Sequence, residues 1–504
     1  MISHVEANQP PRTRLTEGQT LDVLIIGGGI VGSGVARDAA MRGLNVGLVE
    51  QNDFASGTSS RSSRLLHGGL RYLAQGRVGL VREASLEKRI VQDIAPHLAE
   101  PLPFVFPTYR GTQWKRWKLG IGVKIYDLLC NGRNFGRSQT LSKDKTRDTL
   151  PGINPDGLTG AVRYFDGLTQ DARLVIDTLR SASNHGARVC NYIRYDEASL
   201  NNNLWECRLR DSLNDQAFTL HAHTVINAAG PWADRMKHGR TKLRLTKGVH
   251  LVIDRDRLPL PDAVVMAQGS RILFAIPWGE RMILGTTDTD YNGPLANPSC
   301  DPQDVEYVLN VTNSVFPNAS LSIEDVLASW SGLRPLVAKG DAAGTPSDTS
   351  RSHSIGMTEP GWIDVAGGKL TTYRLMAEQT VDRIVEHLAK DVKPCQTADQ
   401  PLLPSDSLAG SGITPPEVTR QQVEHYCQNE WATHLDDIMI RRSSWAHYHK
   451  DPDAIAEKVA GWMAEFFQWD QRRVDDEMAR YHNALTFPHT IEAPELRAQE
   501  TVRA

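Results

Sequence analysis

Residues 21–32 read LDVLIIGGGIVG, an apolar strand pattern that passes directly into a glycine-rich turn. An alanine-rich helix pattern follows, and a second strand pattern ends in Glu50. In this order Gly27 permits the tight turn, Gly29 lets the backbone approach a pyrophosphate, and Gly32 lets helix and strand pack closely. A carboxylate about 20 residues beyond the turn is placed to hydrogen-bond an adenosine ribose. The chain is therefore predicted to bind a dinucleotide, with its phosphates at the helix N-terminus.

Length and composition set the broad class of the protein. The chain has 504 residues, of which 40% are hydrophobic, so we expect a soluble protein of about two to four domains. A net charge of -4 argues against a dedicated nucleic-acid binder. The six cysteines show no CxxC pair and no metal-ligand spacing, which predicts free thiols and no metal. No run approaches about 18 apolar residues, so no membrane span is expected.

The patterns beyond residue 50 indicate a second sheet and further helices. A loop rich in small residues at 54–69 is expected to line the cofactor cleft, because long loops inside domains are usually functional. The density of strand patterns indicates a mixed or antiparallel second sheet; they lie at 204–209, 224–227, 249–253, 272–276, 281–284 and 362–365. Helix patterns lie at 78–96, 369–390, 417–429 and 453–467.

Several ordered motifs give the sequence a specific resemblance. They are Ser59-Ser60, His67-Gly68-Gly69-Leu70-Arg71-Tyr72, Asn227-Ala228-Ala229-Gly230, Gly285-Thr286-Thr287-Asp288, Gly332-Leu333-Arg334-Pro335-Leu336 and Gly367-Gly368-Lys369-Leu370-Thr371-Thr372-Tyr373-Arg374. With these motifs the chain resembles the FAD-dependent glycerol-3-phosphate dehydrogenases, within the D-amino-acid-oxidase-like flavoprotein superfamily. The resemblance runs from about residue 21 to 385, some three-quarters of the chain.

The resemblance implies an α/β fold with FAD as its cofactor. A discontinuous, Rossmann-like FAD-binding domain would comprise 21–80, 160–240 and 345–392, and an inserted mixed-sheet substrate domain would comprise 81–159 and 241–344. The remaining parts are expected to be a disordered tail at 1–20 rather than a signal peptide, a linker at 393–416 and a small helical C-terminal domain at 417–504. The segment beyond 395 is harder to match to the family, although 436–442 resembles one of its helices.

Contacts to FAD are expected at both ends of the cofactor. The helix start after Gly29 would face the pyrophosphate, and a second glycine-gated helix start after Gly368 would face the pyrimidine edge of the flavin ring. The full set of cofactor-binding candidates is Gly27, Gly29, Gly32, Glu50, Ser59, Ser60, Ala229, Gly230, Gly367, Gly368, Leu370 and Thr371.

The oxidation of a secondary alcohol by hydride transfer to flavin requires a base for the hydroxyl proton and a clamp for the substrate. His67 is the favoured base, with Tyr72 and His250 as lesser alternatives. A phosphorylated substrate needs a cationic clamp, and arginine can grip phosphate oxygens with its planar fork. Arg334 and Lys369 join His67 as catalytic candidates. The expected substrate-binding residues are Arg71, Tyr72, Arg334, Arg351 and Lys369.

The predicted reaction is the oxidation of sn-glycerol 3-phosphate to dihydroxyacetone phosphate, with electrons passed from FAD to quinone. One alternative is an FAD-dependent oxidase of an amine or another hydroxy acid, which would use oxygen and form hydrogen peroxide. A second alternative is a non-catalytic flavin-binding redox module. A nicotinamide enzyme is disfavoured, because the dinucleotide fold is already assigned to FAD. The sequence leaves open the oligomeric state and whether the flavin is covalently attached.

Residues 114–126 bear on contact with a membrane. This segment, WKRWKLGIGVKIY, mixes aromatic, cationic and aliphatic residues on a potential helix, a composition typical of an interfacial anchor. The alternative is a helix that packs on the core and leaves one basic face in solvent. The expected location is the cytoplasm, and an anchor here would add peripheral attachment to the inner face of the cell membrane.

Overall fold

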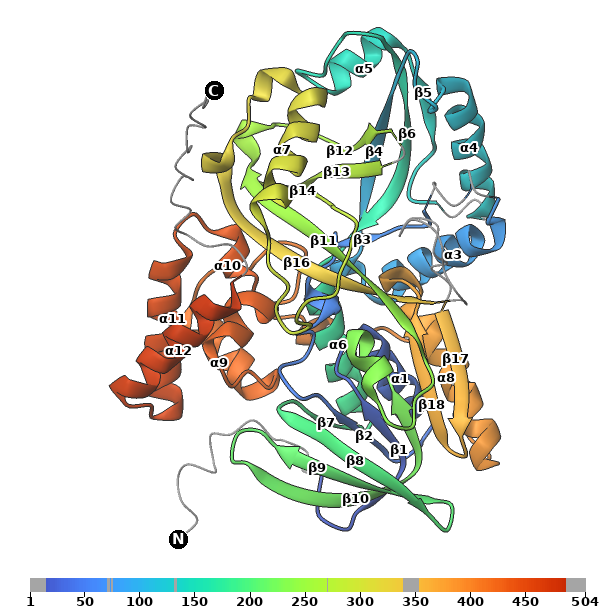
Figure 1. Cartoon of the computed structure of the whole chain (residues 1–504), viewed down its shortest axis with the longest axis vertical. Coiled ribbons are helices and arrows are strands. Elements are labelled where there is room, and N and C mark those ends of the chain that lie inside the picture. The colour runs from blue at the N-terminus through green and yellow to red at the C-terminus, as the bar shows by residue number, and fades with distance from the viewer. Residues whose placement is uncertain are drawn as a thin grey trace, which may run out of the picture.

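The computed structural model describes residues 15–69, 73, 76–130, 134–269, 271–338 and 353–485. Within these residues the chain forms two large β-sheets and a group of C-terminal helices packed beside them (Figure 1). The α/β class and the helical C-terminal domain expected from the sequence are confirmed.

The first sheet contains the strand that precedes the glycine turn. Its strands are β1 (Thr20–Ile26), β2 (Val46–Val49), β7 (Arg188–Cys190), β8 (Ile193–Asn201), β9 (Leu204–Asp211), β10 (Gln216–Asn227), β17 (His353–Glu359) and β18 (Trp362–Gly367). In the described part of the chain their order is β17-β18-β10-β1-β2-β7, and the hairpin of β8 and β9 continues from β10. β1 is parallel to β2 and β10, and β10 is parallel to β18, as in a dinucleotide-binding sheet.

β1 is apolar throughout because both faces of the first sheet are covered. Val23 and Ile25 pack into the core formed with the helices α1 (Ile30–Met41), α6 (Asp171–Asn184) and α8 (Tyr373–Leu388). Leu24 and Ile26 point to the opposite face and pack into a second core that contains Trp205 of β9. A strand buried on both faces has no alternation of polar and apolar residues, which explains the continuous run in the sequence.

The second sheet is mixed and is built largely from the middle of the chain. Its strands are β3 (Leu65–Leu66), β4 (Glu100–Tyr109), β5 (Gln139–Leu141), β6 (Leu158–Leu168), β11 (Leu243–Asp254), β12 (Ala263–Gln268), β13 (Arg271–Trp278), β14 (Arg281–Gly285), β15 (Thr289–Asp290) and β16 (Val326–Val337). The long pair of β11 and β16 runs antiparallel beside the first sheet (Figure 1). Helix α7 (Pro302–Val315) covers one face, α4 (Arg116–Leu129) packs on the other, and α5 (Lys143–Thr149) precedes β6.

Two observed boundaries differ from the expected division of the chain. Helix α3 (Val78–Ile94) bridges the two units, because Val81 lies in the core of the second sheet while Val91 and Ile94 lie in the core of the first. β6 belongs to the second sheet, although residues from 160 were expected in the first domain. The strand segments at 204–209, 224–227 and 362–365 lie in β9, β10 and β18 of the first sheet, within the ranges 160–240 and 345–392 expected for the FAD-binding domain.

The C-terminal helices form a compact unit with its own core. Its elements are α9 (Arg420–Asn429), a π-helical turn (Asp437–Arg442), α10 (Trp445–Tyr448), α11 (Pro452–Phe467) and α12 (Gln471–Ala484). The expected linker before it is fastened to the first domain rather than loose. The Arg37 guanidinium donates to the carbonyl oxygens of Thr397 and Gln400 at 3.1 and 2.7 Å, and Leu402 is buried in the first core.

Candidate active site

The glycine turn after β1 is shaped by close backbone contacts. Gly27 has a φ of +115°, and a Cβ on it would lie 2.5 Å from the carbonyl oxygen of Ala228. A Cβ on Gly32 would lie 2.0 Å from the carbonyl oxygen of Gly27. Neither distance admits a side chain, so glycine is required at both positions. The same contacts bring Ala229 and Gly230, which follow β10, beside the turn.

The N-terminus of α1 opens beside the small-residue loop. Ser59 Oγ accepts a hydrogen bond from the backbone N–H of Ile30 at 3.0 Å, and a Cβ on Gly29 would lie 3.1 Å from this oxygen. Thr58 Oγ1 donates to the carbonyl oxygen of Leu333 at 2.7 Å, which ties the loop to β16. Ser60 is buried in the same short turn. A helix N-terminus lined by backbone N–H groups and hydroxyls is suited to phosphate oxygens.

Glu50 braces the glycine turn from the end of β2. Its carboxylate accepts backbone hydrogen bonds from Gly28 at 2.8 Å and from Asn52 at 3.0 Å. Burial raises the pKa of Glu50, and these two backbone donors oppose that rise. The carboxylate is therefore held in one orientation next to the turn.

His67 is fixed by a residue 304 positions away in the chain. Thr371 Oγ1 accepts a hydrogen bond from the His67 backbone N–H at 2.9 Å and donates to the His67 carbonyl oxygen at 3.2 Å. Thr371 lies in a 3₁₀ turn (Leu370–Thr372) that follows Gly367, Gly368 and Lys369. The helix expected from 369 thus begins with this turn and becomes α-helical at Tyr373.

A buried polar network supports the segment after His67. The Gly68 N–H donates to Tyr126 Oη at 2.9 Å, and that hydroxyl donates to Asp166 at 2.5 Å. Lys88 Nζ donates to the same Asp166 oxygen at 2.9 Å. Burial raises the pKa of Tyr126 well above its ordinary value, so it remains a hydroxyl donor. Nothing in the residue spacing indicated this network, which joins α3, α4 and β6.

Arg334 lies on β16 and lines a cavity beside the small-residue loop. Its guanidinium donates to Thr286 Oγ1 at 3.0 Å, to the Thr287 carbonyl oxygen at 3.3 Å and to Asp288 at 3.2 Å. A Cβ on Gly248 would lie 2.4 Å from Arg334 Nη2, so glycine on β11 leaves the room that the guanidinium fills. The motif 285–288 noted in the sequence therefore holds Arg334 in place.

His250 lies on β11 beside this cation. Its Nε2 is 2.7 Å from Ser63 Oγ, and its ring stacks on Trp330 with centroids 5.4 Å apart. Burial, together with the positive charges of Arg334 and Arg64, lowers the pKa of His250 to about 3. The imidazole is therefore neutral at physiological pH, and at this pKa it is a weak base.

A cavity of about 700 Å³ connects these groups. Its polar wall includes Ser59, Ser63, His67, His250, Arg334, Gly367, Gly368, Lys369, Leu370 and Thr371. Much of the remaining lining is apolar and aromatic, with Phe104, Phe106, Trp114, Leu119, Ile121, Ile125, Tyr164, Ile272 and Phe274, and it also includes the cations Arg61, Lys115, Lys118 and Arg271. The volume falls in the range of about 300–1,000 Å³ usual for small-molecule sites.

The structure brings most of the candidates from the sequence together. His67, Arg334 and Lys369 line the cavity along with Ser59 and the 367–371 segment, and the glycine turn and Glu50 lie next to its Ile30 end. Arg71, Tyr72 and Arg351 lie outside the described residues. In the described part of the chain, no cluster of His, Cys, Asp and Glu side chains is arranged to hold a metal ion.

These residues fit FAD. The steric requirement for glycine at 27 and 32 creates a side-chain-free turn at the α1 N-terminus. A second glycine pair, with φ values of +74° and +79° at 367 and 368, lines the cavity. An elongated dinucleotide needs such backbone-lined ends with a wider chamber for its ring. The cavity walls provide that chamber between the two ends.

Comparison with known proteins assigns the family. The family model "FAD dependent oxidoreductase" matches residues 22–374, and the model "C-terminal domain of alpha-glycerophosphate oxidase" matches 379–474. The second model covers much of the segment beyond residue 395, which was harder to match to the family from its motifs.

Named relatives agree with this assignment. A glycerol-3-phosphate dehydrogenase of Mycobacterium leprae (strain TN) is 34% identical over 517 residues, which cover 92% of this chain and 88% of that protein. The aerobic glycerol-3-phosphate dehydrogenase of Staphylococcus aureus (strain USA300) is 39% identical over 389 residues, covering 75% and 70%. The solved structure of glycerol-3-phosphate dehydrogenase from Bacillus halodurans complexed with FAD has a TM-score of 0.75 and 30% identity, covering 94% and 96%. The chain therefore belongs to the FAD-dependent glycerol-3-phosphate dehydrogenase family of FAD-dependent oxidoreductases.

Proposed function

We propose that this enzyme oxidises sn-glycerol 3-phosphate to dihydroxyacetone phosphate and passes the electrons to a quinone. The observation that carries the proposal is that His67, Arg334 and Lys369 all line the cavity that adjoins the FAD-binding turn. Bound FAD supplies a ring that accepts a hydride from the carbinol carbon and hands the electrons on. The names of the relatives support the choice of substrate.

The chain's own groups divide the work of binding and proton transfer. His67 is half-buried and held through its backbone, so its imidazole is placed to take the hydroxyl proton as the hydride leaves. The phosphate of the substrate loses hydrating water when it enters the cavity. The positive charges of Arg334 and Lys369 compensate for that loss. His250 is neutral and hydrogen-bonded to Ser63, so it is suited to orient the substrate hydroxyl rather than to act as the base.

Anaerobic titration of the purified flavoprotein tests the reaction and the substrate together. Glycerol 3-phosphate should bleach the visible flavin band, whereas glycerol, lactate and glycine should leave it in place, because they lack the phosphate that Arg334 and Lys369 would bind. Bleaching by lactate or glycine would instead support the oxidase alternative. Aerobic turnover then identifies the acceptor, since an oxidase forms hydrogen peroxide and a dehydrogenase reduces added quinone.

The apolar wall of the cavity supports a quinone as the acceptor. It includes Ile121 and Ile125 of helix α4 and Trp114, which lies just before that helix. Ile121 and Ile125 are at the same time 55% and 40% exposed on the outer surface. An apolar route that reaches the surface at a helix suits an acceptor that is itself apolar.

Helix α4 presents an apolar stripe to the outside of the molecule. Trp117, Ile121, Ile125 and Leu128 recur at helical spacing and are 62, 55, 40 and 75% exposed, while Leu119, Val123 and Tyr126 face the core. The helix lies at the outer edge of the second sheet (Figure 1). Lys115, Arg116, Lys118 and Lys124 are also exposed along it. We propose that this face lies on an anionic membrane surface. Among the described residues, no helix has both the length and the apolar character needed to cross a membrane.

The double variant Trp117→Glu/Leu128→Glu tests this contact. Burial of each apolar side chain contributes about 1.5–3 kcal/mol, so binding to vesicles of equal parts phosphatidylcholine and phosphatidylglycerol should weaken at least 100-fold. The measurement is co-sedimentation with the vesicles, and the visible flavin spectrum reports that the variant is folded. Leu213→Glu, at a 40% exposed apolar residue of the first domain, is the control and should bind as the wild type does. Equal binding by all three proteins would exclude α4 as the contact.

A further inference from the structure

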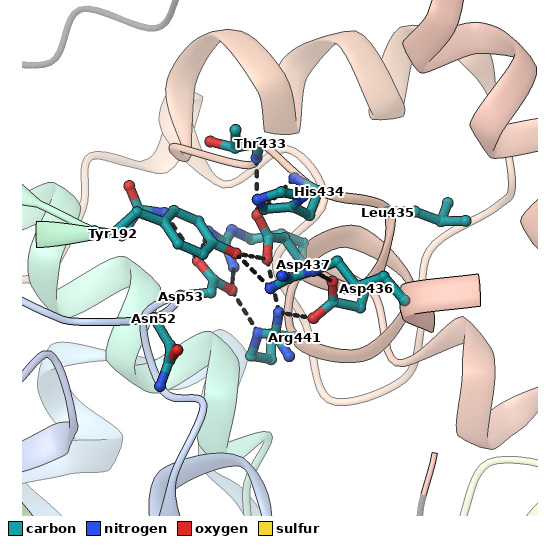
Figure 2. Close-up of polar contacts among 12 residues, drawn as sticks. Asn52, Asp53, Tyr192, Thr433, His434, Leu435, Asp436, Asp437 and Arg441 are labelled. Carbon is teal, nitrogen blue, oxygen red and sulfur yellow. Dashed lines mark hydrogen bonds and ion pairs between the residues drawn. The ribbon is translucent and has the colours of Figure 1, made fainter. Parts of the chain in front are cut away.

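We propose that the C-terminal domain sets the affinity for FAD, by holding the loop after Glu50 through Arg441 and Arg442. The contact residue on that loop is Asp53, which is not among the residues that line the cavity and is buried against the π-helical turn Asp437–Arg442 (Figure 2). Asp53 is therefore a positioning residue, which acts on the cofactor through the glycine turn.

Asp53 receives an unusually complete set of donors. Arg442 binds it with two N–H groups, at 2.7 and 2.8 Å, and Arg441 Nε donates to it at 2.5 Å. Asn191 Nδ2 adds a fourth donor at 3.1 Å. The Asp53 and Arg442 side chains are both fully buried. The two guanidinium groups hold the pKa of Asp53 well below its usual range, although burial alone would raise it.

The loop that Asp53 anchors also forms a wall of the glycine turn. Phe54 is fully buried, and its ring would lie 2.6 Å from a Cβ on Gly28, so the two residues are in close contact. The Ala55 N–H donates to the Gly28 carbonyl oxygen at 3.0 Å. On the other side Glu50 accepts from the Gly28 N–H. A shift of residues 52–55 therefore moves Phe54 and Ala55, which contact Gly28. It also moves Glu50, the carboxylate expected at the adenosine end, because the Asn52 N–H donates to it.

The arginines that hold Asp53 are themselves fixed within the C-terminal domain. Arg441 Nη2 donates to Asp436 at 2.6 Å and to Asp437 at 2.7 Å. Tyr192 Oη donates to Asp437 at 2.6 Å, as Figure 2 shows, and thereby joins the first domain to the same cluster. The Arg442 Nε donates to the Glu430 carbonyl oxygen at 2.9 Å. Each arginine thus contacts both Asp53 and groups of the C-terminal domain, which fixes the guanidinium groups that hold the loop.

An aromatic contact reinforces the same loop. The ring of Phe54 packs edge-to-face on Trp431 of the C-terminal domain, with centroids 5.5 Å apart and planes at 87°. Thus Phe54 lies between Gly28 of the cofactor turn and Trp431 of the C-terminal domain. The C-terminal domain therefore holds the loop after Glu50 at two adjacent residues, through ion pairs to Asp53 and an aromatic contact to Phe54.

The test measures the dissociation constant of FAD by ultrafiltration of the holoenzyme at a temperature where every variant is folded. Asp53→Asn keeps the size of the side chain but leaves two buried guanidinium groups without their shared carboxylate. We expect the dissociation constant to rise at least tenfold, and excess FAD to restore full occupancy. Arg442→Lys keeps the charge but loses the two-pronged contact, and should show a smaller rise in the same direction.

Glu430→Gln is the matched control. Glu430 is fully buried and its carboxylate binds Arg173 of α6 at 2.5 and 2.9 Å, so it also joins the C-terminal domain to the first domain. The substitution changes only this carboxylate and keeps the backbone carbonyl that Arg442 binds. This variant should lower the unfolding temperature about as much as Asp53→Asn while its FAD dissociation constant stays within threefold of the wild type. Equal loss of FAD by both variants, or wild-type affinity in Asp53→Asn and Arg442→Lys, would overturn the proposal.

Discussion

Replacing His67 with alanine is expected to slow the anaerobic reduction of the flavin by glycerol 3-phosphate by about 10²- to 10⁴-fold, the usual contribution of a positioned general base. The imidazole lines the cavity, and its backbone is fixed by both hydrogen bonds of Thr371, so alanine should remove the base without moving the loop. Stopped-flow measurement of the visible flavin band under saturating substrate gives the rate directly. An unaltered rate would exclude His67 as the base.

His250→Asn is the matched control, because it replaces the other histidine among the described residues that line the cavity. The measurement is the pH dependence of the rate of flavin reduction. A base must be neutral to act, so protonation lowers the rate on the acidic side, and the rate rises as the pH passes the pKa of that base. The pKa of His250 is lowered to about 3, so this residue is already neutral throughout pH 5–8. His250→Asn should therefore leave the acidic limb at the same pH, even if the rate at each pH is lower. Displacement of that limb in His250→Asn would identify His250 as the base instead.

The cofactor end of the site was predictable because its chemistry is local. A Cβ on Gly32 is blocked by the carbonyl oxygen of Gly27, within the strand, turn and helix that the sequence itself outlines. The contact that forbids a side chain on Gly27 comes instead from Ala228, so there the sequence pattern predicted the glycine but not its neighbour. The apolar run of β1 likewise reports burial on both faces. The motif that contains Arg334 was found by resemblance to the family. The structure explains why the motif at 285–288 accompanies it, since residues 286–288 hold the Arg334 guanidinium.

Partners far apart in the sequence were not predictable. Periodicity shows that a residue is buried, but it does not show against what, so neither the Thr371 brace on His67 nor the Tyr126 contact to Gly68 could be foreseen. Buried ion pairs are harder still, because charged residues ordinarily indicate an exposed surface. Asp53 and Arg442 are separated by 389 positions and look like surface residues in the sequence.

Arg334→Ala is expected to raise the KM for glycerol 3-phosphate by about 10- to 150-fold, which corresponds to the loss of a charged hydrogen bond worth about 1.5–3 kcal/mol. The visible flavin spectrum should be unchanged, because Arg334 lies on β16 and its hydrogen bonds go to residues 286–288, not to the glycine turn. Steady-state kinetics with a water-soluble dye as the acceptor measures KM without a contribution from membrane contact.

Two further variants separate a phosphate clamp from a general effect of charge. Arg334→Lys keeps the positive charge but cannot grip two phosphate oxygens, so its KM should lie between those of the wild type and Arg334→Ala. Arg257→Ala removes an arginine whose ion pair with Asp325 lies outside the cavity, and its KM should equal that of the wild type. If KM is unchanged in Arg334→Ala, the phosphate is bound elsewhere, and Lys369, which lines the cavity beside the Gly367-Gly368 pair, is the next residue to replace.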